Sequence, residues 1–411
     1  MKRRRRKNII KLITSGLLLT IFSVGLGYTS YIIVNKNNNN FPSSPTIKYD
    51  VKEFEKNYRL SLIAVGDALY HDGVYKDCYN KETKKYDCTK QLSLIKPIVS
   101  NYDLAFYNQE TILGGTELGL SGYPNFNSPY EVGDAFIDAG FNLVSTSTNH
   151  TYDKKEKGIL NSRSYWLSKE KDGIYAQGTY NSFEDRESHM TKIYEKNGIT
   201  YAFLAYTKGL NGNVLPNGKE YLVNVFDYDQ AKKDIEAVRD KADVVIVSMH
   251  WGKDVTSFNN PSAEPWTKYP KGKNPKEQAK FLADLGVDII IGHHPHIINP
   301  IEYIDNTLVI YSLGNFISAQ SSDSYYNKKI GLMTSIDIVK TVKNNQTTIK
   351  LENLDNELLY THYSSKEGYK VIPFSQMNSS YNKNYKELYN RYKNVVKMYD
   401  ETISVKPLNE S

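Results

Sequence analysis

The 411-residue sequence contains only two cysteines, so the fold does not rest on a framework of disulfides. A chain of this length does not need one, because it can bury a sizeable hydrophobic core. Cys78 and Cys88 lie close together in a polar, lysine-rich stretch, which favours a small disulfide-closed loop in an oxidising compartment. Metal binding by this pair is disfavoured, since no histidine or further cysteine lies between them.

Net charge is nearly absent outside the N-terminus. Residues 1–11 hold seven of the 52 Lys and Arg residues and none of the 46 Asp and Glu residues, which leaves 45 basic and 46 acidic residues, a net charge of −1, in the rest of the chain. A nearly neutral body gives no electrostatic reason to expect a nucleic acid partner.

The basic cluster at the N-terminus precedes a long apolar segment. Residues 12–34 carry no charge and are mostly apolar, and at a rise of about 1.5 Å per residue such a helix crosses a hydrocarbon core of roughly 30 Å. The positive-inside rule keeps residues 1–11 in the cytoplasm, so we expect a single-pass protein of the cell membrane with an extracellular C-terminal domain. A cleavable signal peptide is the alternative, but its apolar region is shorter, roughly 7 to 15 residues, and ends in small residues.

The chain after this segment divides at changes of composition. Residues 35–58 begin with an Asn-, Ser- and Pro-rich stretch that cannot bury enough apolar surface to fold, which predicts a flexible linker. We expect one domain over residues 59–365. A C-terminal helical extension follows over residues 366–411, where apolar side chains recur at helical spacing.

Short apolar strands alternate with amphipathic helical segments along the expected domain. The strands are predicted at residues 60–65, 104–107, 141–148, 199–206, 244–249, 287–291, 307–311 and 332–339, and the helices at 130–139, 158–169, 228–241 and 274–285. The last helix is well delimited, with Asn274 as N-cap, Pro275 at its first position, Glu277 in a capping-box-like pair and Gly286 just past its end. This alternation predicts an α/β architecture in which helices cover the sheets.

Most of the expected strands end in side chains that can bind a metal. Functional sites of α/β folds form beyond the carboxyl ends of the strands, so we expect these side chains to meet. They supply oxygen and nitrogen donors without thiolate, a set suited to one or two divalent ions such as Mn²⁺, Fe²⁺, Zn²⁺ or Ca²⁺. The tract 293–296 alone is equally compatible with a His-rich surface loop, and the other strand ends favour the metal centre. The candidate donors are Asp67, His71, Glu110, Asn149, His150, His250, His294 and His296.

Six short motifs at these strand ends carry a family resemblance. They are Gly66-Asp67, Asn108-Gln-Glu110, Thr148-Asn-His-Thr-Tyr-Asp153, His250-Trp-Gly252, Gly292-His-His-Pro-His296 and Tyr311-Ser-Leu-Gly-Asn-Phe316. In this order they resemble the CapA family of bacterial poly-γ-glutamate capsule synthesis proteins, which is similar to a branch of the calcineurin-like metallophosphoesterases. The resemblance covers roughly residues 59–320. It implies a four-layer α/β/β/α sandwich of the calcineurin-like type, membrane attachment, and a role in making, exporting or anchoring γ-linked polyglutamate.

The resemblance also assigns roles to the strand-end residues. Asp67, His71 and His296 would hold a first metal, Glu110 would bridge, and Asn149, His250 and His294 would hold a second. His150 would donate to the leaving group, oriented by Asp153, and Gly314 and Asn315 would line the substrate site. His293, one position off the His-x-His spacing, is expected to support its neighbours rather than bind metal.

Two motifs depart from the family pattern. Ala68 and Leu69 follow the first aspartate where Met and Arg are common, and Thr148 stands where the third motif often has Asn.

His189 is expected to be a surface residue. Trp251 is expected to belong to the core or the wall of the site.

Three functions are compatible with this sequence. The first is an extracellular metal-dependent hydrolase or transferase that acts on a phosphoester or on the γ-glutamyl amide of a cell-surface polymer, with poly-γ-glutamate as the expected partner. The second is a non-catalytic accessory subunit that binds polymer or the membrane subunits of a capsule synthesis complex. The third is a secreted metallophosphatase unrelated to capsule, and fold-level analogy cannot separate the three.

Overall fold

The computed structural model describes residues 55–253, 271–320 and 326–409, and Phe54–Ser411 forms one compact unit. The expected basic segment, membrane segment and most of the expected linker lie outside the described residues. Within the described ranges no helix is both long and apolar enough to cross a membrane.

The first of two large sheets combines parallel and antiparallel strands. β1 is parallel to β4, and β4, β5 and β6 continue in parallel, whereas β14, β15 and β16 run antiparallel on the other side of β1. The strand order is β16 (Gly368–Pro373), β15 (Gln346–Ser364), β14 (Ile330–Lys343), β1 (Glu55–Leu69), β4 (Leu104–Asn108), β5 (Leu143–Ser145) and β6 (Tyr175–Gln177), with β13 (Asn315–Ser318) paired to β1 off this path.

The second sheet has a parallel centre and antiparallel edges. β12, β10, β9 and β8 are parallel, and β11 and β7 close the edges. The strand order is β11 (Ile298–Ile304), β12 (Thr307–Leu313), β10 (Ile289–His293), β9 (Val244–His250), β8 (Ile199–Thr207) and β7 (Tyr194–Lys196).

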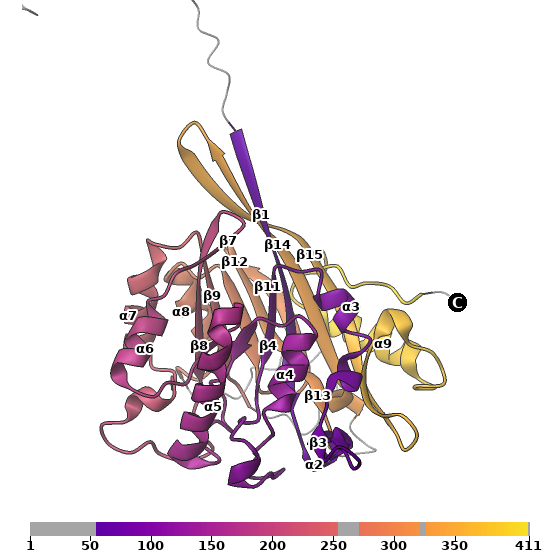
Figure 1. Ribbon diagram of the computed structural model, residues 1–411. Coiled ribbons are helices and arrows are strands. Elements are labelled where there is room, and N and C mark those ends of the chain that lie inside the picture. The colour runs from indigo at the N-terminus through magenta and orange to yellow at the C-terminus, as the bar shows by residue number, and fades with distance from the viewer. Residues whose placement is uncertain (1–54, 254–270, 321–325, 410–411) are drawn as a thin grey trace, which may run out of the picture. The chain divides into compact units, whose positions relative to one another are not determined.

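The two sheets pack face to face and helices cover their outer faces (Figure 1). Strand β9 shows why: Val244 and Ile246 point into the core between the sheets, whereas Val245 and Val247 pack under helices. The second sheet is covered by α7 (Tyr228–Arg239) and α8 (Pro275–Asp284), and the first by α2 (Asp72–Asp77), α3 (Lys96–Val99), α4 (Glu131–Asp138) and α5 (Lys155–Lys169). The predicted α/β fold is confirmed, and its layers follow the order α/β/β/α.

The remaining elements lie at the edges of this arrangement. Helix α6 (Phe183–Met190) follows β6, and α9 (Tyr385–Val396) adds Leu388, Tyr392 and Val395 to the core between the sheets. The short hairpin of β2 (Tyr79–Asn80) and β3 (Lys85–Tyr86) is enclosed by a disulfide between Cys78 and Cys88, whose Cα atoms are 4.8 Å apart.

Several local features differ from the expected ones. β1 already begins at Glu55, inside the expected linker, because its first residues pair with β14 from Glu55 opposite Lys343. β16 occupies part of the expected helical extension and pairs with β15. Asn274 caps α8 by accepting the N–H of Lys276, but Glu277 bonds to the N–H of Gly272 rather than closing a capping box.

Candidate metal centre

The predicted donors meet where the carboxyl ends of the parallel strands of both sheets come together. Asp67 lies in β1 and Glu110 two residues after β4. His250 ends β9, and His294 follows β10. All four side chains are buried, so the sandwich brings polar groups from both sheets into one enclosed place.

Asp67 is the most heavily contacted carboxylate of this place. Its two oxygens lie 3.3 Å from Nδ1 of His293 and 3.3 Å from Nδ1 of His296, and Asn108 donates to Oδ1 at 2.9 Å. Burial alone would raise the pKa of Asp67, but the hydrogen bonds with the two histidines hold it well below its ordinary value. The carboxylate is therefore ionised at neutral pH and available to a cation.

Beside Asp67, one carboxylate and two imidazoles form a compact cluster. Ligand atoms of Glu110, His294 and His296 all lie within 4.8 Å of one another. His250 adjoins them, with Nε2 3.1 Å from Nδ1 of His294, 3.7 Å from Oε1 of Glu110 and 2.8 Å from Oδ1 of Asn149. Burial lowers the pKa of His250 and of His294 well below the ordinary value, so both rings are neutral and keep a lone pair.

The backbone of the histidine tract is strained. His294 has a φ of +97° and His296 a φ of +59°, a region that residues with a side chain rarely adopt. β1 is also constrained at Gly66, because a Cβ atom there would lie 1.9 Å from the carbonyl oxygen of Gly314. Strain of this kind persists where surrounding contacts enforce it, and here it aims both imidazoles at Glu110.

His150 and Asp153 form a pair at the rim of the centre. Nδ1 of His150 lies 2.8 Å from Oδ2 of Asp153, and the same oxygen accepts the backbone N–H of Phe126 at 2.7 Å. The ring of His150 packs edge-on against Phe126 at 4.6 Å between centroids. Asp153 therefore does more than shape the turn, because it also orients the imidazole of His150.

Three other predicted residues have different surroundings. His71 lies in the adjoining cleft rather than in the Glu–His cluster, with Nδ1 3.1 Å from the carbonyl oxygen of Leu69, and burial lowers its pKa to about 4. Asn315 is fully buried, and its Oδ1 lies 3.0 Å from Nδ1 of His296. Neither Asn315 nor Gly314 lines the cleft that opens from the centre to solvent. The contact of Asn315 is with the ring of His296, which it can hold in position.

His293 and two residues outside the ligand set also have clear positions. His293 is fully buried and stacks on Phe106 at 5.3 Å, between Asp67 and the core. Trp251 is buried and donates its indole N–H to the carbonyl oxygen of Tyr311. His189 is not a plain surface residue, because it contacts Glu170 and Asp185 in a half-buried network.

A cleft of about 590 Å³ opens from the centre to solvent. His71, His150, His294 and His296 line it, together with residues that the motifs did not identify: Tyr123, Phe126, Lys208, Asn211, Lys253 and Gln320. Lys208 follows β8 directly, so it could have been identified from the expectation that functional residues lie just beyond the strands. Asn211 and Phe126 lie in loops whose course no local pattern predicts.

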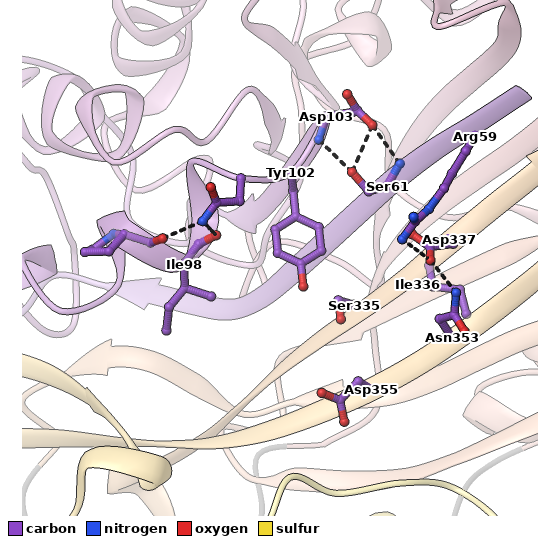
Figure 2. A pocket seen from close by; sticks show the side chains of 12 residues that line it. Arg59, Ser61, Ile98, Tyr102, Asp103, Ser335, Ile336, Asp337, Asn353 and Asp355 are labelled. Carbon is purple, nitrogen blue, oxygen red and sulfur yellow. Dashed lines mark hydrogen bonds and ion pairs between the residues drawn. The ribbon is translucent and has the colours of Figure 1, made fainter.

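A second hollow, of about 720 Å³, lies at the opposite ends of β1 and β4 (Figure 2). Arg59 and Asn353 both donate to Asp337 there, and Asp103 accepts from Ser61. None of its 12 lining residues is a histidine or a cysteine. Because most of its charged groups are already paired, this hollow offers no metal chemistry.

The donor set fits divalent metal ions. Buried carboxylates from the first sheet and buried imidazoles from the second lie close enough to share an ion, and thiolates are absent from the cluster. Oδ1 of Asn315 contacts Nδ1 of His296, the ring atom that also lies 3.3 Å from Asp67, and contacts of this kind orient metal-binding imidazoles.

Comparison with known proteins agrees with these residues. Residues 61–320 match the family model described as bacterial capsule synthesis protein PGA_cap. The chain belongs to the PGA_cap family. The PGA biosynthesis protein CapA of Bacillus subtilis (strain 168) is 30% identical over 223 residues, which cover 49% of this chain and 52% of that protein. The capsule biosynthesis protein CapA of Bacillus anthracis is 29% identical over 274 residues, 64% of this chain and 61% of that protein.

The matched part of this PGA_cap chain thus spans between half and two thirds of the length of these curated relatives. Among solved structures, the calcineurin-like phosphoesterase YfkN from Bacillus subtilis is similar at a TM-score of 0.40 and 13% identity, over 83% of this chain and 98% of that one.

Proposed function

We propose that this protein acts in capsule formation, as a membrane-anchored member of its family whose extracellular domain cleaves bonds in a capsule polymer with the help of bound divalent metal ions. The polymer we propose is poly-γ-glutamate, in keeping with the names of the two curated relatives. The single observation that carries the catalytic part is the convergence of Asp67, Glu110, His250, His294 and His296 from two sheets. We also assign the sandwich to the calcineurin-like metallophosphoesterase type.

The proposed chemistry is hydrolysis of an amide or phosphoester bond. Asp67, Glu110, Asn149, His250, His294 and His296 would hold the ions. A bound divalent ion polarises a carbonyl or phosphoryl oxygen and makes a water molecule a better nucleophile at neutral pH.

The chain's own groups complete the reaction at the rim of the cleft. As water adds to the carbonyl carbon and the C–N bond breaks, His150 gives a proton to the leaving nitrogen. The two protons of the water then restore His150 and protonate the released amine. Asp153 holds the ring in the orientation that this transfer needs. The products are a carboxylate and a free amine, so each cleavage shortens the polymer.

The proposed location follows from the N-terminal sequence. Residues 12–34 would form a single-pass anchor with residues 1–11 in the cytoplasm and the sandwich outside. A disulfide between Cys78 and Cys88 is compatible with an oxidising exterior. Membrane subunits of a capsule synthesis complex are the proposed protein partners.

Metal analysis combined with a cleavage assay tests this function. The purified protein should contain one or two divalent ions and release primary amines from γ-linked polyglutamate, and Glu110→Gln and His250→Ala should abolish release while the protein stays folded. A metal-loaded protein that binds polymer without shortening it would show an accessory role instead. Preferential turnover of simple phosphoesters would point to a metallophosphatase.

A further inference from the structure

A lysine-lined groove continues from the cleft of the metal centre. It has a volume of about 710 Å³ and is bounded by the loop after β8, the turn after β9, the start of α7 and the segment before α8. Lys208, Asn211 and Lys253 line both the cleft and this groove, so the two hollows share a wall.

The groove is strongly cationic for a chain whose body is nearly neutral. Among the residues that the structure describes, four lysines line it, Lys208, Lys253, Lys271 and Lys273, together with one carboxylate, Asp227. The carboxylate of Asp227 is already used, because it accepts the N–H of Gln230 at the start of α7. Several ammonium groups along one groove attract an anionic ligand.

The walls of the groove are fixed by contacts of their own. Lys208 donates to the carbonyl oxygen of Gly252 at 2.7 Å, and the hydroxyl of Tyr228 donates to that of Gly272 at 3.0 Å. The ring of Tyr228 packs edge-on against Phe226 at 5.1 Å and against Phe281 at 4.7 Å. The groove therefore combines fixed aromatic surface with ammonium groups.

We propose that this groove binds an extended polycarboxylate chain and leads it into the metal centre. The regular carboxylates of the chain would meet Lys271 and Lys273 at the outer part and Lys208 and Lys253 next to the histidines. The methylene groups between the carboxylates would lie on Phe226 and Tyr228. The proposal deepens the proposed function, because it rests on the same centre and names the form of the substrate as a chain and not a small ester.

Lysine is compatible with a chain of separate carboxylates. Its ammonium is a compact point charge on a flexible stem, so several lysines can meet singly charged groups spaced along a chain, and lysine binds phosphate as well. No arginine lines the groove or the cleft among the residues that the structure describes. A polyphosphate chain remains the alternative that the experiment must distinguish.

Binding of a labelled γ-linked decaglutamate to the purified full-length protein tests the groove. The double variant Lys271→Gln/Lys273→Gln should weaken binding about tenfold at low salt, which corresponds to about 1.4 kcal/mol. The difference should shrink near 1 M salt, where exposed charges are screened within roughly 3 Å. The matched control is Lys241→Gln/Lys366→Gln, which removes the same charge from lysines outside the groove and should stay within twofold of the unmodified protein.

Two further arms define the ligand. Free glutamate should compete only weakly, because it cannot reach both ends of the groove, and polyphosphate of equal charge should bind less tightly than decaglutamate. Equal binding by the groove variant and its control would overturn the proposal, and so would tighter binding of polyphosphate.

Binding and cleavage measured side by side on the unmodified protein and on Lys271→Gln/Lys273→Gln keep the two proposals apart. Lysine-dependent binding without any cleavage by the unmodified protein would retain the groove and reject the hydrolase. Cleavage that is unchanged in Lys271→Gln/Lys273→Gln would retain the hydrolase and reject the groove.

Discussion

The Nδ1 atom of His150 lies 2.8 Å from Oδ2 of Asp153, an oxygen that also accepts the backbone N–H of Phe126. This contact fixes the ring of His150 at the rim of the cleft, and the preceding residue, Asn149, contacts His250. One loop after β5 thus supplies both an expected metal ligand and the expected proton donor.

Replacing this pair should separate catalysis from metal binding. His150→Ala should lower kcat by on the order of 10²–10³-fold, because positioned proton donors contribute effects of this size. Asp153→Asn should lower kcat by a smaller factor and leave KM and metal content unchanged, since it acts only through the orientation of His150. Amine release and elemental analysis measure the two effects, and His362→Gln, away from the cleft, is the control. A loss of metal in His150→Ala would assign this histidine to the ligands instead.

Removal of metal should destabilise the protein. A ligand that binds only the folded state at about 100 times its Kd stabilises that state by about 2.7 kcal/mol, so chelation should lower Tm by several degrees and added divalent ion should restore it. Thermal unfolding with and without chelator measures the shift. His294→Ala should show the low Tm in both conditions, and a chelator shift that survives in this variant would place the ion elsewhere.

Asn315 should influence metal affinity without binding the ion. Its Oδ1 lies 3.0 Å from Nδ1 of His296, and loss of such outer contacts typically weakens metal binding about 10–100-fold. Asn315→Ala should show this loss in a metal titration, whereas Asn315→Asp retains an acceptor oxygen and should recover most of the affinity. If both variants bind metal as the unmodified protein does, His296 is not held by this contact.

The ion pair of Arg163 and Asp185 should be a main source of pH-dependent stability. Arg163 is almost fully buried and donates two hydrogen bonds to Asp185, at 2.9 and 2.7 Å. Burial raises the pKa of Asp185, but hydrogen bonds with His189 and Arg163 outweigh it and hold the pKa well below its ordinary value. A carboxyl whose pKa is lower in the folded than in the unfolded state stabilises the fold above the unfolded value, and this contribution is lost as pH falls toward the folded value.

Asp185→Asn should therefore lower the free energy of unfolding by about 3 kcal/mol at pH 7, because it leaves a buried guanidinium without its partner. The variant should also lose part of the decline in stability between about pH 5 and pH 2. Chemical denaturation across this range measures both effects. Asp134→Asn, which removes an exposed pair with Lys169, is the control and should cost less than about 1 kcal/mol.

The sequence predicted those parts of the fold in which local pattern and burial agree. The runs Val244–Met249 and Leu60–Val65 are apolar because both faces of each sheet are buried, and α8 carries its cap and its terminal glycine. β15 escaped prediction because Gln346–Asp355 is polar and mostly exposed, and only pairing with β14 makes it a strand. The start of β1 was missed for the same reason.

The candidate site shows a similar division. Residues that follow apolar strands, such as Asp67, Glu110 and His250, could be collected from the sequence, because parallel strands deliver their ends to one place. Phe126 and Asn211 reach the cleft through long loops, and the contact of Asn315 with His296 depends on β13 pairing with β1. Such relationships arise from tertiary contacts that no short pattern records.

Anomalous diffraction from crystals of the protein grown with Mn²⁺ tests the central claim most directly. The account predicts a peak among Glu110, His294 and His296, with His250 or Asp67 completing the ligands, and loss of that peak in Glu110→Gln. Well-ordered crystals with no peak at these residues, or with manganese bound only elsewhere, would contradict it.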